Sequence, residues 1–259
     1  MKFIKPLIFV CSILLSLSVH AEKITVAAAS DLKFAMDEIV AIFKKTNSSD
    51  EIDVIYGSSG KFSTQIQQGA PYDLYFSADI GFPRELAKNG FAASEVKPYA
   101  FGRIVLWSAN LDASKMTLAS LADPKITRIA IANPKHAPYG KRAVEALHAA
   151  GQWDKMEPKL VYGENIAHTA QYVQSGNAQV GIIALALAVN PELAKKGGYW
   201  LIPNNLHAPL EQGFIITKQG ANNALAKRFA DYIGSKPARA VMTQYGFVLP
   251  GESTTKQAL

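Results

Sequence analysis

The feature that most constrains this chain is a short apolar strand that runs through small residues directly into a helix. The first example is residues 24–36, where the strand runs through three alanines into a helix that begins at Ser30. A helix N-terminus placed after a strand points unpaired backbone N–H groups, and the positive end of its dipole, beyond the strand's carboxyl end. The same design recurs at residues 56–61, 137–140 and 163–166. Four such turns around one cleft are suited to a small oxyanion.

Strands and helices alternate along the chain in two successive series. The first series predicts strands at 23–28, 52–56 and 73–77 and helices at 30–45, 62–68 and 82–89. After a long strand at 99–108, the second series predicts helices at 118–122, 141–150 and 168–174 and strands at 128–132, 160–162 and 180–183. A second long strand at 210–217 precedes helices at 224–233 and 238–245 and a closing strand at 247–249. This alternation predicts an α/β fold with mostly parallel sheets flanked by helices.

Two α/β units joined by two long strands predict a two-lobed protein in which the second unit is inserted into the first. We expect lobe I to contain residues 22–102 and 213–259, and lobe II residues 103–212, with the strands at 99–108 and 210–217 crossing between them. Ligands of open α/β sheets bind beyond the carboxyl ends of the strands and between domains. All four candidate anion turns follow predicted strands, so we expect them at one interlobe cleft.

The N-terminus has the pattern of a cleaved signal peptide, residues 1–21. Lys2 and Lys5 precede an apolar run at 7–19, and Val19-His20-Ala21 supplies small residues at the cleavage positions. The alternative is a membrane anchor, but about 13 apolar residues fall short of the ~20 that a spanning helix needs. We therefore expect an extracytoplasmic, periplasmic protein. The one cysteine, Cys11, lies inside this run without a lipoprotein context, so the mature chain has no thiol for a disulfide, a nucleophile or a zinc site.

Composition and charge indicate a folded protein that handles anions. The chain has 259 residues, of which 49% are hydrophobic, enough for a sizeable core. Cleavage after Ala21 leaves 25 of the 27 basic residues against 21 acidic ones. The basic residues are scattered, and the sequence has no basic run with interleaved aromatics, which is the pattern typical of nucleic-acid binding. We expect a monomer that binds a small molecule.

Serines at the first two turns are candidate ligands. Ser30 either caps its helix or offers its hydroxyl and N–H to an anion. Ser58 and Ser59 stand between Gly57 and Gly60, which allow close backbone approach, and their hydroxyls donate without charge. The alternative for Ser58 and Ser59 is a flexible turn.

The other two turns offer backbone donors. Tyr139 precedes a helix that opens with two basic residues, so its N–H can reach the cleft while its ring covers the cleft. A tyrosine packed on the surface is an alternative of equal weight. Ile166 contributes only its N–H. Molybdate, tungstate and sulfate are fully deprotonated at neutral pH, and each hydrogen bond to an ionised group contributes about 1.5 to 3 kcal/mol. A pocket of neutral donors also discriminates against hydrogen phosphate, whose proton needs an acceptor.

Enzyme and metal motifs are missing from the sequence. Gly60-Lys61 and Gly140-Lys141 lack the glycine and the Ser or Thr of a nucleotide phosphate loop, and residues 57–61 lack the spacing of a hydrolase elbow. The histidines form no His-x-x-x-His pair: His136, His148, His168 and His207. We expect no enzyme activity, no cofactor and no metal held directly by side chains.

From residue 24 to about 249, the chain resembles the periplasmic molybdate-binding proteins of ABC importers. The stretches that carry the resemblance are Ile-Thr-Val-Ala-Ala-Ala-Ser at 24–30, Gly-Ser-Ser-Gly at 57–60, Gly-Ala-Pro-Tyr-Asp-Leu-Tyr-Phe-Ser-Ala-Asp at 69–79, Asn-Pro-Lys-His-Ala-Pro-Tyr-Gly at 133–140, Gly-Glu-Asn-Ile at 163–166 and Tyr-Gly-Phe at 245–247. The resemblance implies a type II binding protein whose two lobes close on molybdate or tungstate and deliver it to an inner-membrane ABC permease. It also implies four ligand positions: the hydroxyl and N–H of Ser30, Ser59, and the N–H groups of Tyr139 and Ile166.

Two positions depart from the pattern. Some members of the family add a tyrosine hydroxyl where this chain has Ala184, and Tyr139 stands where those members have a small residue and is expected to compensate. Some relatives have Asn or Leu at the position of Asp31, where a carboxylate facing the ligand would repel a dianion or accept a phosphate proton. We expect Asp31 to favour the positive end of its helix with its side chain turned away.

Two rivals remain open at this point. One is a receptor for sulfate, thiosulfate or phosphate, and the other is a periplasmic hydrolase of phosphate or sulfate esters. The hydrolase would need a metal cluster or an activated nucleophile. The sequence does not distinguish a molybdate receptor from a tungstate receptor, because the two anions have nearly the same size, charge and geometry.

Overall fold

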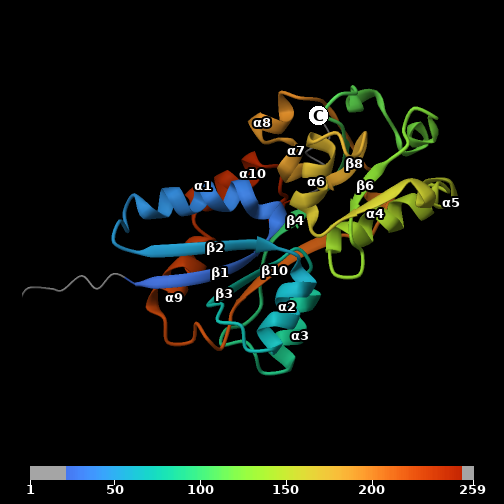
Figure 1. The fold of residues 1–259 in the computed structure, drawn as a ribbon. Helices are drawn as coiled ribbons and strands as arrows, with labels where there is room; N and C mark the ends of the chain where they lie inside the picture. Colours follow the sequence, from blue (N-terminus) through green and yellow to red (C-terminus); the bar gives the residue numbers. More distant parts are fainter. Residues whose placement is uncertain (1–21, 253–259) are drawn as a thin grey trace, which may run out of the picture.

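The structure, a computed structural model, describes residues 22–252 and contains two five-stranded sheets, each flanked by helices (Figure 1). The predicted signal peptide, residues 1–21, lies outside the described residues. Within residues 22–252, no helix has both the length and the apolar character needed to cross a membrane.

The first sheet has the strand order β2-β1-β3-β10-β4. Its strands are β1 (Lys23–Ala29), β2 (Glu51–Gly57), β3 (Leu74–Ser77), β4 (Lys97–Gly102) and β10 (Leu210–Ile216). β1 pairs in parallel with β2 and β3, and only β10 runs antiparallel to its neighbours. The helices of this half are the 3-10 turn η1 (Ser30–Leu32), α1 (Lys33–Lys44), α2 (Ser59–Gln67), α3 (Gly81–Lys88), α9 (Ala224–Tyr232) and α10 (Lys236–Gln244).

The second sheet repeats this architecture in the order β7-β6-β8-β5-β9, with β5 as its antiparallel strand. Its strands are β5 (Ile104–Trp107), β6 (Ile129–Ala132), β7 (Leu160–Gly163), β8 (Val180–Ala184) and β9 (Tyr199–Leu201). Its helices are α4 (Pro138–Ala149), α5 (Trp153–Met156), α6 (Ile166–Gln174), α7 (Leu185–Ala188) and α8 (Pro191–Ala194), with short 3-10 turns at η2 (Ala113–Lys115), η3 (Leu118–Ala122), η4 (Glu157–Lys159) and η5 (Asn204–Leu206). The predicted α/β class with mostly parallel sheets is confirmed.

The connections between the sheets differ from the expected long crossing strands. The predicted strand at 99–108 is two strands, β4 and β5, which lie in different sheets and are separated at Arg103. β10 pairs with β3 and β4 over its whole length, so the second connection is the segment 202–209 that precedes it. Apolar and aromatic residues flank Arg103 on both sides, which is why the pattern alone placed a single strand at 99–108. The lobe limits themselves remain predictions.

Each sheet has its own apolar core. Phe76 and Phe214 stack 4.7 Å apart between ring centroids under the first sheet, and Trp107 is fully buried within the second. The predicted closing strand at 247–249 is wrong as a strand: only an isolated bridge joins Val248 to Phe101. Its two backbone hydrogen bonds still attach the C-terminal segment to β4.

Candidate functional site

The four strand-to-helix turns meet at one small cavity between the two halves. They follow β1, β2, β6 and β7, as predicted, and the cavity has a free volume of about 200 Å³ counted out to its mouth. All six candidate residues line it: Ser30, Asp31, Ser58, Ser59, Tyr139 and Ile166. The structure therefore brings together residues that are up to 136 positions apart in the sequence.

Ser30 bridges the two halves at the end of β1. Its hydroxyl donates to Asn165 Oδ1 at 3.1 Å, and its oxygen accepts the Ala167 N–H at 3.3 Å. Asn165 in turn caps α6, because its side chain accepts the His168 N–H. Ser30 is thus held against the N-terminus of α6 from the opposite half.

Ser59 is placed to donate into the cavity. It is the first residue of α2, its oxygen accepts the Ala78 N–H at 3.0 Å, and its backbone carbonyl accepts the Tyr75 hydroxyl at 2.7 Å. These bonds hold the side chain and leave its hydroxyl proton uncommitted. Ser58 differs, because its hydroxyl bonds the His136 carbonyl and lies 2.9 Å from His136 Nδ1. Ser58 therefore joins the halves more than it offers a donor.

Tyr139 and Ile166 occupy the first turns of α4 and α6. The first N–H groups of a helix have no intrahelical acceptor. Pro138, the first residue of α4, has no N–H, so the first one available in that helix belongs to Tyr139. Ile166 is the first residue of α6. Both residues line the cavity, so the positive ends of two helix dipoles lie close to it.

The side chain of Asp31 lies in a buried hydrogen-bond network that the sequence did not predict. Its side chain is almost fully buried, and its Oδ2 accepts the Tyr139 hydroxyl at 2.9 Å and the Gln212 amide at 2.8 Å. The sequence pattern failed here because both partners are remote in the chain. Burial raises the pKa of Asp31 to about 6, against the hydrogen bonds from Gln212 and Tyr139, which lower it.

Further contacts close the halves around the cavity. The Gly60 N–H donates to the His136 carbonyl at 2.9 Å, Lys61 forms an ion pair with Glu164, and Arg142 Nη2 lies 3.7 Å from Asp79 Oδ2. Each of these contacts joins residues of the first sheet's half to residues of the second. The structure is therefore a closed arrangement, with the cavity between the halves.

Comparison with known proteins assigns the chain to a family. Residues 24–248 match the family described as bacterial extracellular solute-binding protein. The chain belongs to this family. The molybdate-binding protein ModA of Rhodobacter capsulatus is 33% identical over 90% of this chain and 91% of its own length, and that of Azotobacter vinelandii is 33% identical over 91% and 94%.

Solved structures agree with this fold. The periplasmic molybdate-binding protein of Azotobacter vinelandii superposes with a TM-score of 0.82 at 32% identity, covering 88% of this chain and 99% of that one. The sulfate-binding protein SubI of Mycobacterium tuberculosis, at 16% identity and a TM-score of 0.71, shares the fold, with 90% and 88% of the two chains covered. These relatives are binding proteins. The chain accordingly has the fold of an extracytoplasmic solute-binding protein.

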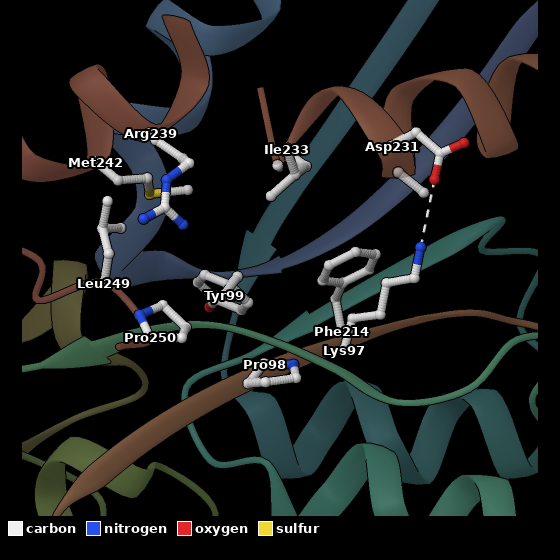
Figure 2. Close-up of a pocket in the computed structure, with 12 residues that line it drawn as sticks. Lys97, Pro98, Tyr99, Phe214, Asp231, Ile233, Arg239, Met242, Leu249 and Pro250 are labelled. Carbon is white, nitrogen blue, oxygen red and sulfur yellow. Dashed lines mark hydrogen bonds and ion pairs between the residues drawn. The ribbon is translucent and has the colours of Figure 1, made fainter. Parts of the chain in front are cut away.

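A second cavity of this family member lies apart from the anion turns. It is lined by β4, β10, α9 and α10 and has a free volume of about 640 Å³ counted to its mouth (Figure 2). Its walls are mostly apolar, and Lys97 and Asp231 form an ion pair at 3.3 Å on one side. None of the six candidate residues lines it. In residues 22–252, no group of three or more His, Cys, Asp or Glu side chains could hold a metal ion.

Sequence reasoning missed two polar residues of the site. Asn165 orients Ser30, and its signal was the N-cap position in Gly-Glu-Asn-Ile. Gln212 is fully buried within β10, where its amide donates to Asp31 and its oxygen accepts the Tyr99 hydroxyl at 2.6 Å. An amide in a buried strand signals a hydrogen-bond network, because burying it without partners is costly.

Proposed function

We propose that this protein is an extracytoplasmic receptor that captures molybdate or tungstate between its lobes and delivers it to an inner-membrane ABC permease. The observation that carries this proposal is the convergence of Ser30, Ser59 and the N-termini of α4 and α6 on one small cavity between the halves. The names of its relatives point to the same anion. The proposed ligands are the Ser30 and Ser59 hydroxyls and the N–H groups of Ser30, Tyr139 and Ile166, with Asp31 and Ser58 as secondary contacts.

The donor set fits a fully deprotonated dianion. Neutral N–H and O–H groups at helix starts stabilise negative charge, and each bond to an ionised oxygen contributes about 1.5 to 3 kcal/mol. Donors come from both halves, so the anion binds them together and favours closure. The receptor acts as a monomer, needs no cofactor and performs no chemistry on its ligand. It is exported by its signal peptide, residues 1–21, and it releases the anion when the permease favours the open form.

Isothermal titration of the mature protein, freed of bound anion by unfolding and refolding, tests this function. We expect one-to-one binding of molybdate and of tungstate, and no heat from sulfate or phosphate at the same concentrations. Tight sulfate or phosphate binding without molybdate binding would replace the proposal with the rival receptor. Turnover of an aryl phosphate that Ser59→Ala abolishes would instead indicate the hydrolase.

A further inference from the structure

Asp31 presents a specific problem to any dianion in the cavity. Asp31 is one of the residues that line the cavity, its side chain is almost fully buried, and its two carboxyl oxygens have different surroundings. Oδ2 accepts two hydrogen bonds, from the Tyr139 hydroxyl and from the Gln212 amide. Oδ1 is buried, and no side chain among residues 22–252 forms a hydrogen bond with it. If Asp31 were ionised, Oδ1 would be a hydrogen-bond acceptor near the bound anion, whose oxygens are also acceptors. Such an arrangement is unfavourable for both the carboxylate and the anion.

We propose that Asp31 binds the oxyanion as a neutral carboxylic acid, with its proton on Oδ1, so that capture of the dianion takes up one proton from solvent. This inference rests on the proposed function. Because Oδ2 already accepts two hydrogen bonds, it is the carbonyl oxygen of the neutral acid. The proton is therefore on Oδ1. The protonated Oδ1 then donates to an oxygen of the ligand. The carboxyl group becomes one more neutral donor in a pocket of donors.

The surroundings of Asp31 favour this protonation. Burial already raises the pKa of Asp31 to about 6, and a bound dianion would raise it further by charge repulsion. The two phenols that face it, Tyr139 from α4 and Tyr99 from β4, stay neutral, because burial raises their pKa values well above 10. Gln212 and Asn165 are uncharged.

The charged side chains around the cavity are otherwise paired or set back from Asp31. Lys33, next along its own segment, pairs with Asp37 at 3.4 Å, and Arg142 from α4 faces Asp79. Lys61 and Glu164 pair with each other. His136, which contacts Ser58, is a further titratable group near the cavity, and burial lowers its pKa. His136 therefore has to be separated from Asp31 by experiment.

Titration of molybdate into the refolded protein between about pH 7 and 8.5 measures the predicted coupling. When only the protonated form binds, the apparent Kd rises close to tenfold for each pH unit above the pKa. Heats measured in two buffers of different ionisation enthalpy should give uptake of about one proton per anion bound. Sulfate or tungstate, where bound, should show the same proton uptake.

Asp31→Asn is the matched variant, because it keeps the shape and places a permanent amide donor where Oδ1 carries its proton. We expect it to bind molybdate with a pH-independent Kd, without proton uptake, and more tightly than the wild type at about pH 8.5. His136→Gln should keep the wild-type pH dependence. Proton uptake that survives Asp31→Asn and is lost in His136→Gln would overturn the proposal. Tight wild-type binding without proton uptake would also overturn it while leaving the receptor function intact, whereas no molybdate binding at any pH would remove the proposed function itself.

Discussion

A hydroxyl in the cavity can bind an anion only when the protein leaves its proton free. Ser30 directs its proton to Asn165, so it has to reorient to reach a ligand. Ser59 accepts the Ala78 N–H and has its proton uncommitted. The two serine hydroxyls therefore differ in how directly they can donate to an anion, and Ser59 can do so without reorienting.

Ser59→Ala removes that donor, and we expect molybdate affinity to fall by roughly ten- to a hundredfold, which corresponds to about 1.5 to 3 kcal/mol. It also leaves the Ala78 N–H without an acceptor, so unfolding free energy should fall by about 1 kcal/mol or more. Ser63→Ala is the control, because Ser63 is buried on the same helix and does not line the cavity. Calorimetric titration and thermal melts measure both effects. Equal Kd values for the two variants would place the ligand elsewhere.

Asp31 should also make stability depend on pH in the protein without anion. Its folded pKa of about 6 exceeds the ordinary value of 3.8, so between these values the folded state holds a proton that the unfolded state has lost. Stability therefore falls as pH rises through this window, by up to about 3 kcal/mol, and the loss is complete above about pH 6. Asp31→Asn should be more stable than wild type at about pH 8 and equal to it near pH 4 by urea denaturation. If the stability difference between Asp31→Asn and wild type is the same at both pH values, the pKa of Asp31 is not raised in the folded state.

Strand-to-helix turns are the elements that the sequence predicts best. Ser30, Ser59, Tyr139 and Ile166 could be placed at these turns because a strand end, small residues and a helix start follow one another locally. The network of Asp31, Tyr139, Gln212 and Tyr99 was not found, because its members come from four elements far apart in the chain. The break at Arg103 was also missed, since residues 99–108 keep a continuous strand pattern across two sheets. Local signals position the turns, and only the assembled fold shows which side chains meet.

The first turn of α2 has to approach the loop before α4 closely for the halves to close. A Cβ at Gly60 would lie 2.8 Å from the His136 carbonyl oxygen and 3.0 Å from its Cα, both backbone atoms. Gly60→Ala should therefore obstruct closure and weaken molybdate binding about tenfold or more, since overpacking costs about 1 to 3 kcal/mol. The helix itself should gain from alanine.

Gly234→Ala is the control for this variant, because its nearest contact would be an ordinary 3.5 Å to the Asp231 carbonyl in a part of the chain remote from the cavity. Titration should separate the two variants, while melts of both without anion should stay close to wild type. If Gly60→Ala binds as tightly as Gly234→Ala, the closed contact between α2 and His136 is not needed for capture.

At the scale of the whole molecule, each half completes its sheet with one antiparallel strand that lies next to a connection to the other half. β10 enters the first sheet after the segment 202–209, and β5 enters the second directly after Arg103. Two short connections therefore join two independently cored halves. Such an arrangement allows the halves to open and close with few backbone changes, and the ligand stabilises the closed form by contacting both.

An anion that binds only the folded, closed molecule must raise its melting temperature by mass action. At a free concentration of about 100 times the Kd, the gain is about 2.7 kcal/mol, or roughly 5 to 10 °C for a chain of this size. We expect molybdate and tungstate to give this shift, and sulfate at the same concentration to give none. Small-angle scattering should record a smaller radius of gyration on adding molybdate, with no change on adding sulfate. A rise in melting temperature without compaction would mean that the anion binds lobes that are already closed. A rise with sulfate alone would favour the sulfate receptor, because the anion that the donors bind is the one that stabilises the protein.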